Sequence, residues 1–173
     1  MTTATDTPRI YAACLAAYNN GILHGAWIDA NQDAWAIYDA ITAMLRASPI
    51  AGAEEWAIHD HEGFAGVHIH ECAAIDHIVA LATFIARHGA LGAALIDYYG
   101  DFAEARAAIE NRYHGPAASL ADYLQDLTEQ TTEIPDGLRY YIDWPAMARD
   151  AELSGDLIAL QTAPDEVHVF GGY

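Results

Sequence analysis

Charge is the feature that most limits how this chain can fold. The sequence holds 25 acidic residues against 7 basic ones, which gives a formal net charge of −18, and every basic residue is an arginine. Self-repulsion on this scale destabilises a compact state. Solubility alone needs a net charge of only about 2–8 in a small domain. The excess therefore indicates that the negative surface itself has a role.

Three roles for this surface compete. The protein could be adapted to high salt, could bind cations, or could bind a protein surface that normally binds DNA. Nucleic acid is excluded as a partner because the chain has no basic patch that would release counterions from phosphates. Salt adaptation stays open on composition alone. A salt titration of stability separates salt adaptation from binding to a DNA-binding surface, because a halophilic protein unfolds at low salt.

Composition and local sequence also indicate in which cellular compartment the protein works. A hydrophobic fraction of 53% is enough to build a core, so wholesale disorder is not expected. Apolar stretches such as residues 78–85 are too short to span a bilayer, and the N-terminus lacks the pattern of a signal peptide. Cys14 and Cys72 lie in apolar surroundings, which predicts two buried thiols. We therefore expect a cytoplasmic protein with no membrane partner.

The first sixty residues predict a small sheet with one helix. Residues 9–16 are rich in β-formers and predict a strand, and the Asn-Gly turn within 18–21 leads to a second strand at 22–29. Apolar residues recur at helical spacing over 31–47. Alternation over 55–60 predicts a third strand. The order is β-β-α-β.

The middle of the chain is rich in alanine and predicts only helices. Residues 73–88 have helical apolar spacing, and Gly89 ends that helix. A second helix is predicted over 90–99. The third, over 101–113, opens with the Asp-x-x-Glu capping signature at Asp101.

The next helix combines an apolar stripe with an acidic one. Ser119 is its predicted N-cap. The residues expected to be buried are Leu120, Tyr123, Leu124 and Leu127. The acids at i, i+4, i+7 and i+11 are Asp122, Asp126, Glu129 and Glu133. If one helix continues through all four, they share a face with no lysine or arginine partner on it, which is unfavourable to an isolated helix and indicates a binding role.

The remaining elements complete an α+β fold. A short turn or helix is predicted at 135–141, a helix over 145–153 capped by Asp143, and a terminal hairpin of 156–161 with 166–170. The predicted division is a disordered tail over 1–8, an N-terminal α+β domain over 9–63, a helical middle domain over 64–114, and a C-terminal α+β domain over 115–173.

Histidines offer the clearest candidate for a metal site. Two His-x-His pairs are formed by His59, His61, His68 and His70. On a strand, residues i and i+2 share a face, which suits metal ligands, and Glu62 or Glu71 could add an oxygen. Neither pair is followed by the spacing of a zinc motif, so we predict no metal. The alternative is a metal-dependent enzyme built on these histidines, and the absence of stoichiometric zinc or iron in the purified protein would exclude it.

Motifs for catalysis are missing from the sequence. It contains no Gly-x-Ser-x-Gly nucleophile motif, and the glycines of 63–66 are not followed by the lysine and helix of a phosphate-binding loop. The acids are too numerous for a catalytic pair to be singled out. We therefore expect a protein that is not an enzyme and needs no cofactor.

Three segments carry a resemblance to a known family. They are YNNG followed by HGAWID within residues 11–29, EEWAIHDHEGF at 54–64, and IP, YYIDW and ARDAELSGD within 134–156. In these segments the chain resembles the ArdA-type antirestriction proteins. The segments lie in family order and cover nearly the whole chain after the first eight residues.

The resemblance implies a mechanism as well as a fold. It implies three small domains in series in an elongated molecule, a head-to-head homodimer, and mimicry of B-form DNA by carboxylates that follow the phosphate path. The implied target is a type I restriction–modification enzyme, chiefly its specificity and modification subunits. Such proteins are usually carried by mobile genetic elements, and the resemblance implies no catalytic residue and no cofactor.

Two sets of residues follow from this reading. The acids expected in the DNA-mimic surface are Asp29, Asp60, Glu62, Glu71, Asp97, Asp101, Glu104, Asp122, Asp126, Glu129, Glu133, Asp150 and Glu152. The dimer interface is expected at Tyr140, Tyr141 and Trp144, because carboxylates resist burial and this region is apolar. Glutamates and lysines common in family helices are alanines here, as in 103–108, which leaves the middle domain less charged.

Overall fold

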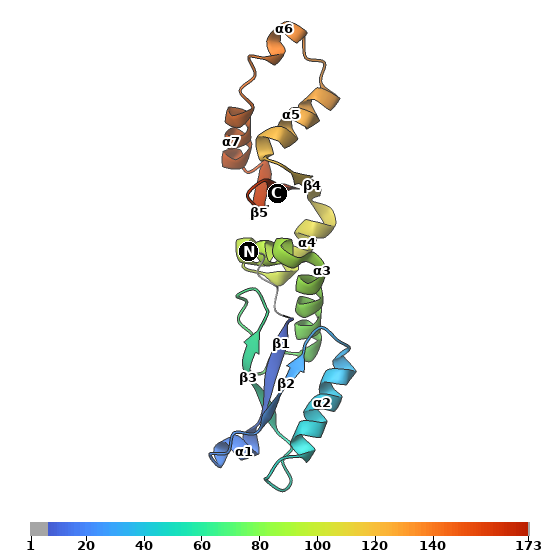
Figure 1. Cartoon of the computed structure of the whole chain (residues 1–173), viewed down its shortest axis with the longest axis vertical. Coiled ribbons are helices and arrows are strands. Elements are labelled where there is room, and N and C mark those ends of the chain that lie inside the picture. Colours follow the sequence, from blue (N-terminus) through green and yellow to red (C-terminus); the bar gives the residue numbers. More distant parts are fainter. Residues whose placement is uncertain (1–6, 173) are drawn as a thin grey trace. The chain divides into compact units, whose positions relative to one another are not determined.

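Two small three-stranded antiparallel sheets and the helices around them make up the fold, which confirms the predicted α+β class (Figure 1). The computed structural model describes residues 7–172, so most of the predicted tail over 1–8 lies outside the described residues. Contacts group the chain into two compact units that meet in the sequence between Asp97 and Tyr98. The division into three domains stays a prediction.

The first unit is built on the sheet β2-β1-β3. Its elements are β1 (Arg9–Cys14), α1 (Leu15–Asn19), β2 (Gly25–Asp29), α2 (Ala34–Arg46), β3 (Trp56–Glu62) and α3 (Ile75–Tyr99), whose last two residues belong to the second unit.

The core of the first unit lies where α2 packs against β1 and β2. Ile10 of the central strand and Ile28 of β2 are opposite each other and buried, and so are Ile37 and Ile41 of α2. Helical spacing thus predicted the burial of Ile37 and Ile41 correctly, but Tyr38, which belongs to the same apolar pattern, is 42% exposed. The helix begins where the Asp33 carboxylate accepts a hydrogen bond from the backbone N–H of Trp35 at 2.8 Å.

The predicted hairpin of 9–16 and 22–29 has the right pairing but the wrong connection. Strands β1 and β2 are antiparallel, and Gly21 takes the left-handed conformation with φ of 71°. However, β1 ends at Cys14, whose Sγ accepts a hydrogen bond from the Ala17 N–H, and the short helix α1 follows. Leucine and alanine favour a helix there, and β2 starts only at Gly25.

Gly25 is a position where no side chain fits. A Cβ atom there would lie 2.6 Å from the Ala12 carbonyl oxygen and 2.7 Å from Cζ of the Tyr11 ring. We expect Gly25→Ala to destabilise the protein by about 1–3 kcal/mol through this overpacking. Urea unfolding measures this change in the free energy of unfolding. Gly137→Ala is the matched control, because a Cβ atom at Gly137 would meet no other atom within 4 Å, and a loss equal to that of Gly25→Ala would contradict the steric explanation.

Helix α3 confirms the predicted break at Gly89. The φ of 54° and ψ of −129° at Gly89 interrupt the helix and divide it into two segments. By length and composition α3 could cross a membrane, since one window reaches a mean hydropathy of 1.6. Each segment is shorter than the about 20 residues that a span needs. Ile78, Leu81 and Ile85 are fully buried within the first unit, so the hydropathy of α3 reflects its place in the core.

His88 makes the stability of the first unit depend on pH. Burial, together with the charge of Arg87, lowers the pKa of His88, whose ring lies 4.7 Å from that of Phe84. The folded state therefore favours the neutral ring, while the unfolded chain takes up a proton below about pH 6.5. Stability should fall as the pH drops from about 6.5 through the lowered folded value. We expect His88→Asn to flatten this part of the stability curve in urea unfolding, and an unchanged slope would contradict it.

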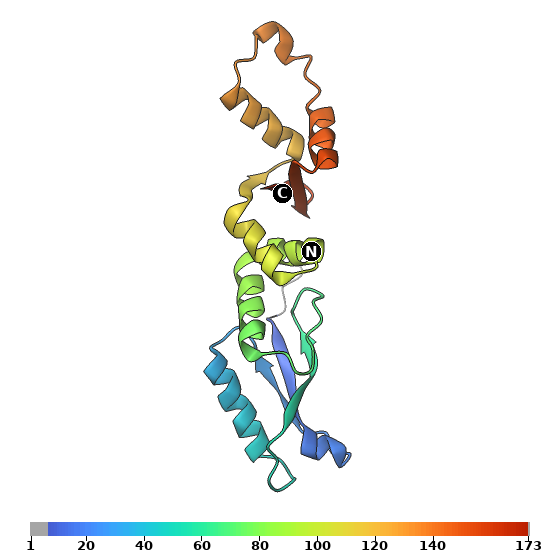
Figure 2. The ribbon, with the colours of Figure 1, turned by 180° about the vertical axis from the view of Figure 1, so that it is seen from behind.

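The second unit is built on the sheet β4-β6-β5. Its elements are α4 (Phe102–Asn111), β4 (Tyr113–Ala117), α5 (Leu120–Thr131), α6 (Asp136–Arg139), α7 (Trp144–Ser154), β5 (Leu157–Ala163) and β6 (Glu166–Gly171). The terminal hairpin is confirmed as β5 and β6. Figure 2 shows α6 in the connection between α5 and α7, away from this sheet.

The sequence reading missed β4. Gly115 and Pro116 interrupt the strand pattern, but β4 is an edge strand, where proline is tolerated. The pairing with β6 shifts between Tyr113 and Gly115, and Gly115 has a φ of 126°. Because of this shift in register, β4 continues through Gly115 and Pro116, which would otherwise end the strand.

Helices α5 and α7 pack on each other and on the second sheet through a small core. Leu120, Leu124 and Ala148 are buried there with Val169 of β6. The predicted caps are confirmed, since the side chains of Asp101, Ser119 and Asp143 each accept a hydrogen bond from the first turn of their helix. The prediction that Leu127 is buried is wrong, because 40% of it is exposed beyond the end of this core.

Candidate functional site

The carboxylates of this protein lie at its surface. Among residues 7–172 every aspartate and glutamate is exposed except Glu62, which is half-buried. Burying an ionised carboxylate is costly without a partner, so a chain with this many acids must spread them outside its cores. The candidate site is therefore a surface rather than a cleft.

Ion pairs neutralise only part of the acidic surface. In the described part of the chain, arginine and carboxylate side chains form the pairs Arg9–Glu62, Arg106–Glu110, Arg112–Glu104 and Arg139–Glu129. Surface pairs of this kind contribute about 0–1 kcal/mol each. They engage four of the seven arginines, and most of the negative charge is left facing solvent.

The register of the first sheet brings three of the predicted acids to one face. Arg9 lies opposite Asp29 on one side and Glu62 on the other, and the neighbouring row places Tyr11 between Trp27 and Asp60. We call these six residues the open face of the first sheet. Directly opposed side chains on one face are close neighbours. Asp29 and Glu62 therefore flank Arg9 in the register, and Asp60 lies in the next row, although sequence reasoning did not include this arginine.

A β-bulge at His59 explains how Asp60 reaches the open face. In the pairing of β1 with β3, Ala12 is opposite Ile58 while Tyr11 is opposite Asp60, so His59 is the extra residue. One inserted residue switches the following side chains to the other face. Because of this switch, the expectation that His59 and His61 share a strand face does not hold.

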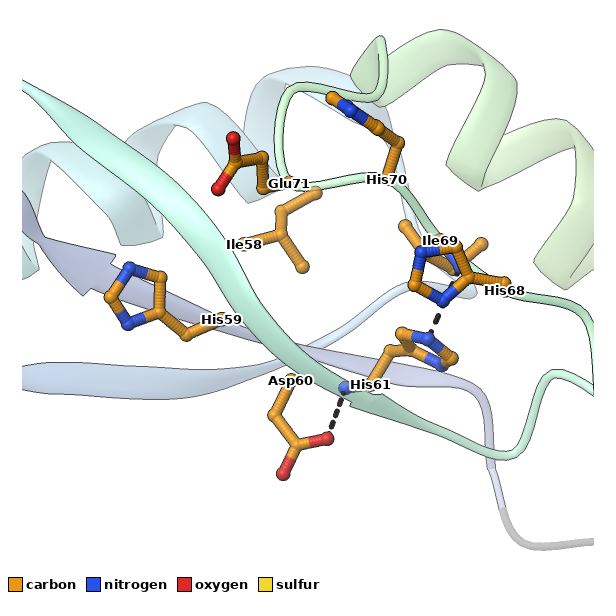
Figure 3. A pocket seen from close by; sticks show the side chains of 8 residues that line it. All are labelled: Ile58, His59, Asp60, His61, His68, Ile69, His70 and Glu71. Atoms are coloured by element: carbon orange, nitrogen blue, oxygen red, sulfur yellow. Dashed lines mark hydrogen bonds between the residues drawn. The ribbon is translucent and has the colours of Figure 1, made fainter.

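The four histidines of the two His-x-His pairs line a pocket of about 490 Å³ together with Ile58, Asp60, Ile69 and Glu71 (Figure 3). His61 Nε2 accepts a hydrogen bond from the Ile69 N–H, and His70 Nδ1 accepts one from the Cys72 N–H, each at 3.1 Å. These nitrogens hold the loop that follows β3. Within residues 7–172, no group of three His, Cys, Asp or Glu side chains could hold a metal ion.

The cysteine prediction is half wrong. Cys14 is buried as expected, but Cys72 is exposed. Cys72 lies in the loop between β3 and α3, where its N–H is bonded to His70, and the core of the first unit is filled by other side chains.

The acidic stripe on α5 is shorter than predicted. Asp122, Asp126 and Glu129 lie at i, i+4 and i+7 of this helix and share a face. Glu133 does not, because Thr132 is extended, with φ of −134° and ψ of 130°, and ends the helix before it. The continuous four-acid helix face is therefore a wrong prediction.

The stripe also has an arginine partner that the sequence pattern did not indicate. Arg139 Nη1 lies 3.0 Å from Glu129 Oε1, because α6 brings the chain back toward α5. The Glu129 carboxylate also accepts a hydrogen bond from Gln125. Asp122 Oδ2 accepts one from the Ser119 hydroxyl at 2.6 Å. Within the stripe on α5, only Asp126 has no such bond among the described residues.

The predicted acids thus fall into two groups. Seven make local side-chain bonds within residues 7–172: Asp29, Asp60, Glu62, Asp101, Glu104, Asp122 and Glu129. Six make no side-chain hydrogen bond or ion pair with the described residues: Glu71, Asp97, Asp126, Glu133, Asp150 and Glu152. Six acids that we did not predict share this state: Asp39, Glu54, Glu55, Asp76, Asp136 and Asp165. We call these twelve the unpartnered carboxylates.

The residues expected at a dimer interface are available for contact. Tyr140 is 92% exposed and Tyr141 is 84% exposed, while Trp144 is half-buried at the start of α7. Exposed tyrosines are typical of protein interfaces. Their use in a dimer stays a prediction.

Comparison with known families gives the chain an assignment. The ArdA antirestriction protein family matches residues 10–165 of the 173. No curated protein matches the sequence. The match spans the first unit from residue 10 and the second unit as far as residue 165, just before β6, so the chain belongs to the ArdA family of antirestriction proteins.

Proposed function

We propose that this protein inhibits type I restriction–modification enzymes by occupying the groove in which their specificity and modification subunits bind DNA. The observation that carries the proposal is the set of twelve unpartnered carboxylates, which are free to meet basic side chains of another protein. A carboxylate that already serves as a helix cap or ion-pair partner would have to break that bond first.

Total charge supports mimicry of a duplex. Two copies of the chain would carry about 36 net negative charges, and duplex DNA carries one per about 1.7 Å of axis, so a dimer matches the charge of roughly 60 Å of duplex. We propose that the protein acts as a homodimer formed through Tyr140, Tyr141 and Trp144, which leaves the acids outside the interface.

The expected mode of inhibition follows from the role of phosphate contacts in DNA recognition. Contacts to phosphates fix register but carry no sequence information. A mimic of phosphates should therefore compete with DNA and should act on enzymes of different recognition sequence. It performs no catalysis, needs no cofactor, and works in the cytoplasm, where these enzymes meet incoming DNA.

Displacement of a fluorescent duplex tests the proposal. We expect the protein to displace duplexes from two purified type I methyltransferases that recognise different sequences, and the displacement to weaken as salt rises. If the protein displaces neither duplex at low salt, the proposed inhibition is contradicted. Stability should change little when salt is removed, whereas unfolding at low salt would favour salt adaptation.

A further inference from the structure

Two of the chain's own arginines are held by the same pair of groups. The Arg9 guanidinium carbon lies 4.9 Å from the ring centroid of Trp27, and Arg9 pairs with Glu62. Arg112 lies 5.3 Å from the ring centroid of Tyr99 and 3.6 Å from a Glu104 oxygen. In both places an aromatic face and a carboxylate bind one guanidinium. The carboxylate balances the charge of the guanidinium, and the aromatic ring stacks on its planar face.

The exposed side of α2 has the same groups. Trp35 is 77% exposed, Tyr38 is 42% exposed, and their ring centroids are 6.3 Å apart. Asp39 lies one turn after Trp35 on the same side and is one of the unpartnered carboxylates. The opposite side of α2 is buried in the core, so these three residues are not needed to hold the helix in place.

No arginine of the described chain occupies this site. Among residues 7–172, the cation–aromatic contacts of arginine are those with Trp27 and Tyr99. Arg46 belongs to α2 but is eleven residues beyond Trp35, which is about 16 Å along the helix axis. An exposed tryptophan and tyrosine beside a free carboxylate therefore form a complete guanidinium site without a guanidinium.

We propose that Trp35, Tyr38 and Asp39 form a docking site for an arginine side chain of the target's basic surface. The inference rests on the proposed function and names the side chain that this face binds. Arginine fits better than lysine, because its planar group stacks on an aromatic ring and is more weakly hydrated. Complementary charge favours the encounter, since the chain carries −18 and a DNA-binding groove is basic.

Binding of two labelled peptides, one of arginines and one of lysines of equal length, tests the site without any restriction enzyme. We expect Trp35→Ala to weaken binding of the arginine peptide about two- to fivefold, as an exposed cation–π contact predicts, and to change binding of the lysine peptide less. Trp35→Phe should restore part of the loss. Equal losses for both peptides, or no loss, would overturn the proposal.

Two control variants separate the site from general charge and apolar surface. Asp165→Asn removes one unpartnered carboxylate elsewhere, and Leu153→Ala removes an apolar side chain that is 86% exposed. Neither should change the preference for arginine, whereas Asp39→Asn should reduce it. A wild-type protein that displaces DNA while Trp35→Ala leaves arginine binding unchanged would overturn this inference alone. A wild-type protein that prefers arginine through Trp35 but displaces no DNA would support the site and contradict the proposed function.

Discussion

Neutralising five unpartnered carboxylates of the second unit is expected to remove most of the inhibition. The variant combines Asp126→Asn, Glu133→Gln, Asp136→Asn, Asp150→Asn and Glu152→Gln. The amides keep the side-chain size, and none of the five acids holds a cap or an ion pair in the described structure, so the fold should survive. An exposed ion pair contributes about 0.2–1 kcal/mol, so losing five predicts weaker binding by roughly fivefold to several thousandfold.

The measurement is displacement of a duplex from a type I methyltransferase at several salt concentrations. The variant should also show a shallower salt dependence, because fewer charges take part. The control carries Gln130→Ala, Thr132→Ala and Leu153→Ala, which change the surface in the same region without changing charge. Full potency of the five-fold variant, with its fold intact, would remove these carboxylates from the inhibitory surface.

The largest effect on stability is expected from Phe170→Ala. Phe170 is fully buried in the central strand of the second sheet, and its ring centroid lies 5.0 Å from that of Tyr113. Truncating a buried phenylalanine costs about 3–5 kcal/mol, since contacts are lost and a cavity is left. That is a large part of the about 5–15 kcal/mol by which small proteins are stable.

Urea unfolding followed by near-ultraviolet circular dichroism measures this loss. Leu153→Ala is the matched control, because Leu153 is 86% exposed and its truncation should change stability by less than about 0.5 kcal/mol. A loss below about 1 kcal/mol for Phe170→Ala would mean that the second sheet is not the centre of a packed core.

Local signals in the sequence predicted the helices well. The apolar spacing that places Ile37 and Ile41 on one side of α2 requires only the helical period, and the caps at Ser119 and Asp143 require only a side chain next to the first turn. The positive φ at Gly89, which interrupts α3, likewise depends on one residue. These features could be predicted because the interactions that produce them are a few residues apart.

Features that depend on distant pairing could not be predicted. Strand β4 exists because β6 supplies its hydrogen bonds from fifty or more residues away. The bulge at His59 is defined only by the register with β1, and without it Asp60 would be assigned to the wrong face. The sequence alone has no local signal for either feature.

The candidate site shows the same division. That the acids lie on the surface follows from the cost of burying a carboxylate, so their exposure was predictable. The sequence did not predict which of these acids lack a hydrogen-bond or ion-pair partner. Glu129 was expected to have no basic partner, but Arg139 pairs with it, and the sheet register brings Arg9 to Glu62, which no sequence pattern indicated. Asp136 and Asp165 are unpartnered although no pattern distinguished them.

Equilibrium binding of this protein to a type I methyltransferase, measured at increasing concentrations of duplex, tests the central claim most directly. If the acidic surface occupies the DNA groove, the apparent dissociation constant should rise in proportion to the duplex concentration, and no complex of all three components should form. Binding that stays unchanged at saturating duplex, with protein and DNA on the enzyme together, would contradict mimicry of DNA.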